Sequence, residues 1–200
     1  HLHDFIRETV LPHGNTLHKV LFNSWETTAF DVNASSQAEF AEIAAEMGVE
    51  LFVMDDGWFH GRKDDHAGLG DWWPDEKKFP DGLSPLIERV NELGMDFGLW
   101  IEPEMVNPDS ELYRQHPDWV IHFPTRPRTE SRHQLILNMA KPEVQEYVIN
   151  KIDRLLAENN ITFIKWDMNR NVSEPGWPDA PGEPRELWVR YVQGLYRVWE

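Results

Sequence analysis

The chain has 200 residues, no cysteine and a formal net charge of −16 at pH 7. This charge argues against nucleic acid or an anionic membrane as a partner, because phosphate groups would be repelled. The absence of cysteine excludes disulfides and thiolate catalysis, and no apolar run approaches the roughly 20 residues of a membrane helix. The composition fits a cytoplasmic protein, although the chain begins at His1, so that its native N-terminus can be missing.

Strand and helix signals alternate along the first half of the chain. The pattern predicts a strand over residues 20–25, and Ser36 with Glu39 has the spacing of a capping box that opens a helix. That helix is expected to end at Gly48, where a second strand over residues 51–54 follows at once. Its predicted buried stripe consists of Phe40, Ile43, Ala44 and Met47.

The second half continues the alternation. Ser84 and Pro85 open a helix that ends at Gly94, since proline is favoured in the first turn and glycine after the last. Further strands are predicted over residues 97–101 and 161–166, with a short apolar piece at 135–137. Further helices are predicted over residues 142–159 and from about 186 onward.

Four strand–helix units imply an α/β fold with a parallel sheet. A doubly wound sheet and a (β/α)₈ TIM barrel both satisfy this pattern. The doubly wound sheet is disfavoured because no glycine-rich phosphate fingerprint follows the first strand. The barrel is favoured because residues suited to an active site follow every strand. We therefore expect a TIM barrel, of which residues 1–200 supply about the first four β/α units, with no second domain. The residues that lie at the ends of the four predicted strands are Trp25 and Glu26, Asp55 and Asp56, Trp100 and Glu102, and Lys165 and Asp167.

The residues at two of these strand ends suit sugar chemistry. Asp167 follows an apolar strand, and Lys165 shares its strand face, so that a cation can keep the carboxylate ionised for attack on an anomeric carbon. Asp55 and Asp56 precede Gly57, and paired carboxylates can accept hydrogen bonds from vicinal hydroxyls. An ordinary ion pair and a turn-forming Asp-Gly step are the structural alternatives.

Other polar residues carry weaker signals. Glu102 and Glu104 can act in the site or support it, and Arg132 can offer a planar fork to sugar oxygens. The run Asp64-Asp65-His66 lacks the spacing of a zinc or calcium loop. We therefore expect no metal and no cofactor.

Six short motifs in order resemble the α-galactosidases of glycoside hydrolase family 36. They occupy residues 23–26, 54–58, 69–72, 98–105, 132–135 and 165–169. The resemblance implies a retaining mechanism with Asp167 as the nucleophile. It also implies a substrate site that consists of Trp25, Asp55, Asp56, Trp100, Arg132, Lys165 and Asn169. Residues 1–200 would be the N-terminal half of the glycosidase barrel. The acid/base aspartate would come from a later strand, so that this fragment alone would be inactive.

The expected activity is hydrolysis of terminal, non-reducing α-D-galactose residues in oligosaccharides of the melibiose and raffinose type. The resemblance further implies a homo-oligomer, as a tetramer. An α-N-acetylgalactosaminidase and a galactosyltransferase of the raffinose-synthase type are alternatives within the same chemistry. A non-catalytic galactose-binding module and a purely structural half-barrel are alternatives of another class.

Overall fold

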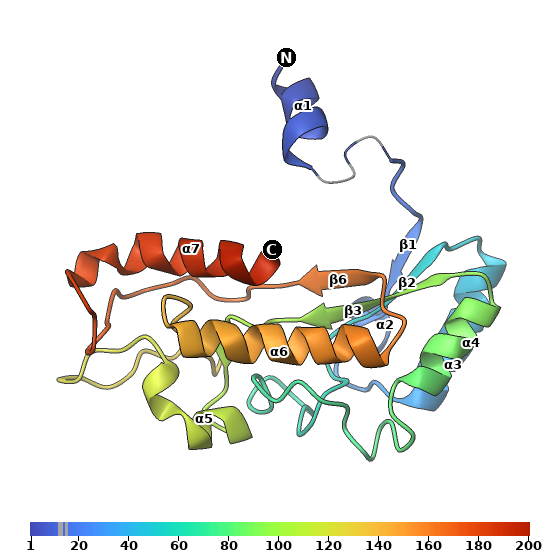
Figure 1. The fold of residues 1–200 in the computed structure, drawn as a ribbon. Helices are drawn as coiled ribbons and strands as arrows, with labels where there is room; N and C mark the ends of the chain where they lie inside the picture. The colour runs from blue at the N-terminus through green and yellow to red at the C-terminus, as the bar shows by residue number, and fades with distance from the viewer. Residues whose placement is uncertain (12–13, 15) are drawn as a thin grey trace.

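A computed structural model describes residues 1–11, 14 and 16–200, and its centre is a four-stranded parallel sheet with the order β1-β2-β3-β6 (Figure 1). The strands are β1 (Leu21–Asn23), β2 (Leu51–Met54), β3 (Asp96–Ile101) and β6 (Phe163–Trp166). A small antiparallel pair joins β4 (Met105–Val106) to β5 (Leu135–Ile136). The prediction of an α/β fold with parallel strands is confirmed.

Helices connect the strands. The α-helices are α1 (Leu2–Phe5), α2 (Trp25–Thr28), α3 (Ala34–Glu46), α4 (Ser84–Glu92), α5 (Glu111–Gln115), α6 (Pro142–Glu158) and α7 (Leu187–Trp199). A π-helical turn, η1 (Ile6–Val10), and two 3-10 turns, η2 (Pro117–Trp119) and η3 (Pro184–Glu186), complete the set. In Figure 1, α1 stands apart from the rest of the ribbon, and α3 lies beside α4. Within the described ranges, no helix is long and apolar enough to cross a membrane.

The sheet has two protected central strands and two open edges. All residues of β2 are buried, as are those of β3 after Asp96, whereas Leu21 of β1 is 45 % exposed and Phe163 of β6 is 40 % exposed. Unpaired strand edges invite pairing with further strands. The two border strands, β1 and β6, are therefore open to pairing with further strands.

The parallel register places all four strand ends at one edge of the sheet. Met54 aligns with Leu99, and Ile101 aligns with Trp166. The backbone N–H of Asp167 continues the ladder by donating to Ile101 O at 2.8 Å. The ring of Trp166 packs against Trp199 of α7 with centroids 5.8 Å apart, so Trp166 faces the helix layer.

Two local predictions were wrong. The first strand ends at Asn23, because Trp25 already begins α2. The capping box at Ser36 does not form, since the side chain of Asn33 accepts a hydrogen bond from Ser36 N at 2.9 Å and α3 begins at Ala34.

The buried stripe of α3 also differs from the prediction. Of the predicted residues, Ala44 is buried and Phe40 is partly buried against the core, but Ile43 is exposed and Met47 is 79 % exposed. The helix buries Gln37 and Ala41 in their place. The small side chains of Ala41 and Ala44 allow α3 to pack closely against its neighbours. Apolar spacing alone therefore selected a stripe that is rotated relative to the observed one.

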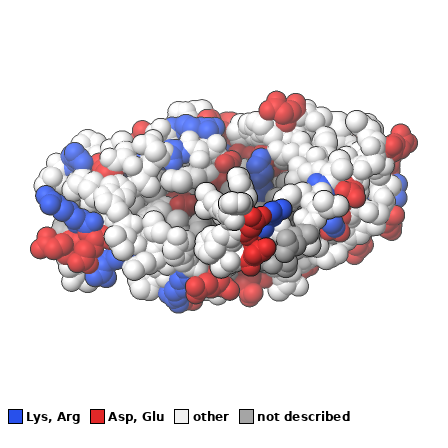
Figure 2. Space-filling model, turned by 90° about the horizontal axis from the view of Figure 1, so that it is seen from above, with Lys and Arg blue, Asp and Glu red and all other residues white. Residues whose placement is uncertain are grey.

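The surface seen from above carries both signs of charge (Figure 2). Lys and Arg side chains are scattered among Asp and Glu, and no broad area of a single sign appears on this face.

Candidate active site

The carboxyl ends of the strands bring several predicted site residues to one edge of the sheet. Ser24, after β1, accepts a hydrogen bond through Oγ from the backbone N–H of Asp55, after β2, at 2.9 Å. Trp100, near the end of β3, donates from Nε1 to Asp167 Oδ2 at 2.9 Å. Active-site residues in barrel enzymes occupy this position. The sheet edge is therefore the candidate site.

Asp167 is partly buried and held by three hydrogen-bond donors. Asn169 Nδ2 donates to Oδ2 at 2.8 Å, in addition to Trp100, and the backbone N–H of Met168 donates to Oδ1 at 2.9 Å. Burial raises the pKa of the Asp167 carboxyl, but these donors and the charge of Lys165 outweigh it, so the pKa lies below its ordinary value. Asp167 is therefore ionised at neutral pH.

Lys165 forms its close contact with Asp55 and not with Asp167. Its Nζ lies 2.6 Å from Asp55 Oδ2, so the side chain reaches from β6 across β3 to the end of β2. The Asp55 side chain is nearly inaccessible, whereas that of Lys165 is 38 % exposed. The Lys165 ammonium group is therefore the more exposed member of the pair. Its positive charge lowers the pKa of the Asp167 carboxyl without a direct contact.

Asp56 forms a bidentate ion pair with Arg62, which lies in the loop after β2. Arg62 Nε and NH2 donate to the two carboxylate oxygens at 2.9 and 2.7 Å, and both side chains are buried. Burial raises the pKa of the Asp56 carboxyl, and the paired guanidinium opposes that rise. The two adjacent aspartates thus have different partners. Arg62 was missed by the sequence reasoning, because it lies within a polar loop and carries no strand-end signal.

Arg62→Ala is expected to lower the free energy of unfolding by about 3–5 kcal/mol, because it leaves the buried Asp56 carboxylate unpaired. Denaturant or thermal unfolding of the intact protein measures this loss. Arg154→Ala is the matched control, since its pair with Glu158 is exposed and such pairs contribute about 0–1 kcal/mol. Equal losses in the two variants would contradict the assignment.

Arg132 reaches Asp167 through an intermediary. Arg132 NH1 donates to Asn169 Oδ1 at 2.8 Å, and Asn169 in turn donates to Asp167. Arg132 and His133 both have left-handed backbone, with φ of 53° and 59°, which is uncommon for residues other than glycine. The turn therefore holds Arg132 over the segment that follows β6.

The two predicted tryptophans have different environments. Trp100 is only 2 % exposed and stacks on Phe59 with centroids 6.2 Å apart, so it contributes an N–H donor and not an open ring face. Trp25 is partly exposed on α2, and its ring meets Phe30 edge-on at 5.1 Å. Of these two tryptophans, Trp25 is the one with accessible surface.

Glu102 is a buried carboxyl that joins the two segments around Asp167. Its Oε1 accepts from Asn169 N at 2.5 Å and its Oε2 accepts from Gln134 Nε2 at 3.2 Å. The side chain is 1 % exposed. Burial raises the pKa of Glu102 to about 7, although hydrogen bonds from Asn169 lower it, and the nearby charge of Asp167 adds to the rise. The sequence had left its role open between acting in the site and supporting it.

Glu102→Gln is expected to stabilise the protein at pH 8 but not at pH 4.5. The folded-state pKa of about 7 exceeds the ordinary 4.5, so the folded protein binds more protons than the unfolded chain between these values. Its stability therefore falls as pH rises through that window, by on the order of 3 kcal/mol at most. Gln134 Oε1, which has no partner, can accept from the new amide. Melting temperatures of both proteins at pH 4.5 and pH 8 test this, and a difference independent of pH would contradict it.

Carboxylates, a lysine and a tryptophan gathered at the strand ends occupy the active-site position of barrel enzymes, and comparisons with known proteins identify the family. The Melibiase family model matches residues 1–200. The chain is 52 % identical over 182 residues to α-galactosidase AgaA of Geobacillus stearothermophilus and 45 % identical over 175 residues to an α-galactosidase of Escherichia coli, covering 90 % and 87 % of this chain and 25 % of each relative. The chain belongs to the Melibiase family and spans about a quarter of these relatives.

Solved structures extend the likeness to the fold. A crystal structure of a GH36 α-galactosidase AgaA variant from Geobacillus stearothermophilus in complex with raffinose matches with 48 % identity and a TM-score of 0.94, over 98 % of this chain and 28 % of that one. Its relative AgaB matches with 49 % identity, the same TM-score and the same coverage. The catalytic domain of these neighbours is a TIM barrel, so the predicted barrel class is confirmed. That residues 1–200 form half of it without a second domain stays a prediction.

Proposed function

We propose that the protein containing this chain hydrolyses terminal, non-reducing α-D-galactose residues of oligosaccharides such as melibiose and raffinose. The observation that carries the proposal is an ionised, partly accessible Asp167 beside the Asp55–Lys165 pair at the sheet edge. Support comes from relatives named α-galactosidases and from neighbours solved with raffinose and stachyose.

The reaction proceeds by double displacement at Asp167. A carboxylate oxygen of Asp167 attacks the anomeric carbon, the glycosidic C–O bond breaks, and the departing oxygen takes a proton from a general acid. Water then attacks the galactosyl ester, gives its proton to the same group and frees Asp167. Two inversions leave galactose in the α configuration. Trp100 and Asn169 hold the attacking carboxylate in place.

The remaining residues would hold the galactose. The Lys165 ammonium can donate to a hydroxyl while Asp55 accepts from a neighbouring one, and such charge-assisted bonds are the stronger kind. Arg132 donates a hydrogen bond to Asn169 and would border the galactose site on the side of the loop before β5. We assign Asp56 and the two tryptophans, Trp25 and Trp100, to the same subsite, with Asp56 sharing its oxygens with Arg62.

We place the acid/base carboxyl outside these 200 residues, as the resemblance implies. Two observations favour this placement. Glu102 is sealed from solvent with both oxygens engaged, and Asp179 pairs with Lys141 at 3.0 Å. A retaining site needs its second carboxyl about 5–5.5 Å from the first. The isolated chain is accordingly expected to bind galactose without turning it over.

Proton NMR of the intact protein acting on raffinose tests the proposal. The first galactose released should be the α anomer, and initial β-galactose would contradict a retaining mechanism. Preferential cleavage of an α-N-acetylgalactosaminide, galactosyl transfer to sucrose, or binding without turnover would each favour one of the alternative functions. We also expect a tetramer, which light scattering of the same sample measures.

A further inference from the structure

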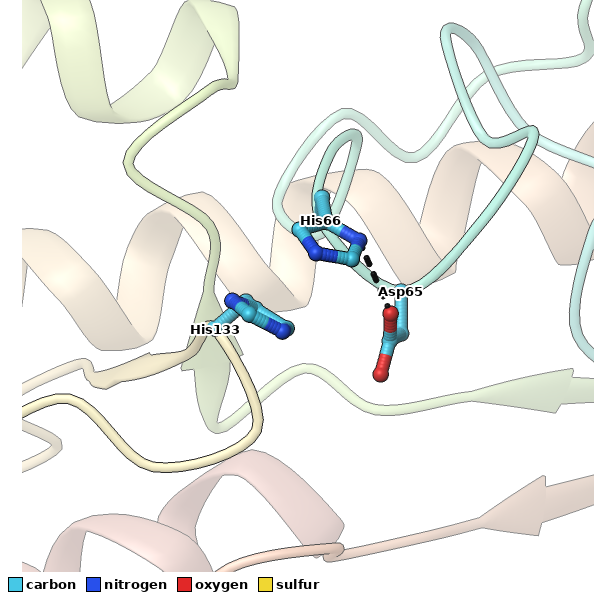
Figure 3. A group of neighbouring side chains, drawn as sticks. All are labelled: Asp65, His66 and His133. Atoms are coloured by element: carbon cyan, nitrogen blue, oxygen red, sulfur yellow. Dashed lines mark ion pairs between the residues drawn. The ribbon is translucent and has the colours of Figure 1, made fainter.

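A second group of chemistry-bearing side chains lies on the loop side of the candidate site (Figure 3). Asp65 and His66 come from the loop between β2 and α4, and His133 comes from the turn before β5. One ligand atom from each lies within 4.8 Å of those of the other two. Two imidazoles and one carboxylate form a ligand set that suits zinc and neighbouring transition metals better than calcium or magnesium.

A buried amide fixes the backbone of both segments. Asn107 Nδ2 donates to Asp65 O at 3.1 Å and to His133 O at 2.8 Å, and Asn107 Oδ1 accepts from Leu69 N at 2.8 Å. Asn107 itself is fully buried. The main chain at the three ligating positions is therefore held in one arrangement before any ligand binds, which limits the entropy cost of binding.

The side chains keep the freedom that coordination requires. The two rings stack with centroids 3.6 Å apart and an interplanar angle of 25°, so the two imidazoles already lie against one another. The His66 side chain is 61 % exposed, and rotation about the bond from Cβ to the ring is soft for imidazole. A modest turn of the rings can direct one nitrogen of each toward a common centre beside Asp65.

We propose that Asp65, His66 and His133 bind a divalent transition-metal ion such as Zn²⁺. Water can complete the coordination shell of the ion. Sequence spacing had argued against a metal here, because His133 stands 67 residues after His66 and only the fold joins them. The ion would tie the Arg132 turn to the loop that carries Arg62, without taking part in bond cleavage.

Calorimetric titration of Zn²⁺ into the intact, chelator-treated protein tests the proposal. One zinc per chain is expected, and His66→Ala and His133→Ala should each weaken binding at least about tenfold, which corresponds to about 1.4 kcal/mol. His60→Ala is the matched control, because His60 is also exposed and stacks on an aromatic ring, that of Trp73 at 5.2 Å. It should leave zinc binding at this site unchanged. Ca²⁺ in excess should not displace the zinc.

Asp65→Asn provides a second variant that keeps the shape of the loop and should also weaken binding. Circular dichroism of each variant verifies that the fold is retained. Absence of zinc binding, or binding that survives in both His66→Ala and His133→Ala, would overturn the proposal. A loss in His60→Ala equal to that in His66→Ala would overturn it as well. None of these outcomes depends on galactoside hydrolysis.

Discussion

Replacing Asp167 by asparagine is expected to lower kcat for α-galactosides by about 10⁴- to 10⁶-fold, the range seen when a covalent nucleophile is removed. The amide is similar in size and can still accept from Trp100 or Asn169, but it cannot form the ester with the anomeric carbon. Galactose binding should therefore survive within a few fold. Single-turnover kinetics with an aryl α-galactoside and calorimetry with galactose measure the two quantities.

Asp179→Asn is the control for this experiment. Asp179 pairs with Lys141 at the start of α6, and the variant should keep the parent kcat. An activated 2-fluoro galactoside should label the peptide that contains Asp167 in the parent protein and leave Asp167→Asn unlabelled. Label on another carboxyl, or a variant with more than about a tenth of the parent kcat, would remove Asp167 from the nucleophile role.

The sequence predicted the sheet and its functional edge because both depend on local patterns. Short apolar runs such as residues 51–54 are buried in a parallel sheet on both faces, so they are recognisable without knowing their neighbours. Residues that directly follow such runs must meet at one edge once the strands are parallel. Asp55 and Asp167 were therefore identified as site candidates by position alone, before any pairing was known.

The partners of these residues could not be predicted, because strand parity gives the face that a side chain occupies but not the neighbour that it meets. Other partners come from loops, whose paths have no period. Lys165 was expected beside Asp167 from strand parity, yet its side chain reaches across β3 to the buried carboxylate of Asp55 at the end of β2. Arg62 and Asn107 were not identified, although both organise the loop after β2. Nothing in their own sequence neighbourhood marks them as buried.

Buried stripes on helices were predicted with uneven success for a related reason. In α4 the large apolar residues at helical spacing, Leu86, Ile87 and Val90, are all buried. In α3 the buried face consists of alanines and Gln37, and apolar size misled the prediction. Where small residues permit close approach, shape decides which face is buried and hydrophobicity does not.

Replacing Asp55 by asparagine is expected to lower kcat/KM for α-galactosides by about 10²-fold, or about 3 kcal/mol, the upper end for a hydrogen bond to a charged group. The substitution removes a charged acceptor for a sugar hydroxyl and leaves the Lys165 ammonium without its partner at 2.6 Å. Lys165→Met should cost a similar factor, because it removes the donor and the charge that helps keep Asp167 ionised.

The double variant separates two roles for the pair. If Asp55 and Lys165 grip galactose as one unit, the double variant should lose little more than either single variant, and the interaction energy in the cycle should exceed about 1 kcal/mol. The same cycle on Asp179 and Lys141, an ion pair at the start of α6, should leave kcat/KM unchanged throughout. Strictly additive losses would mean that each residue meets the substrate separately. The 2.6 Å contact would then be a feature of the fold and not of a joint hold on the substrate.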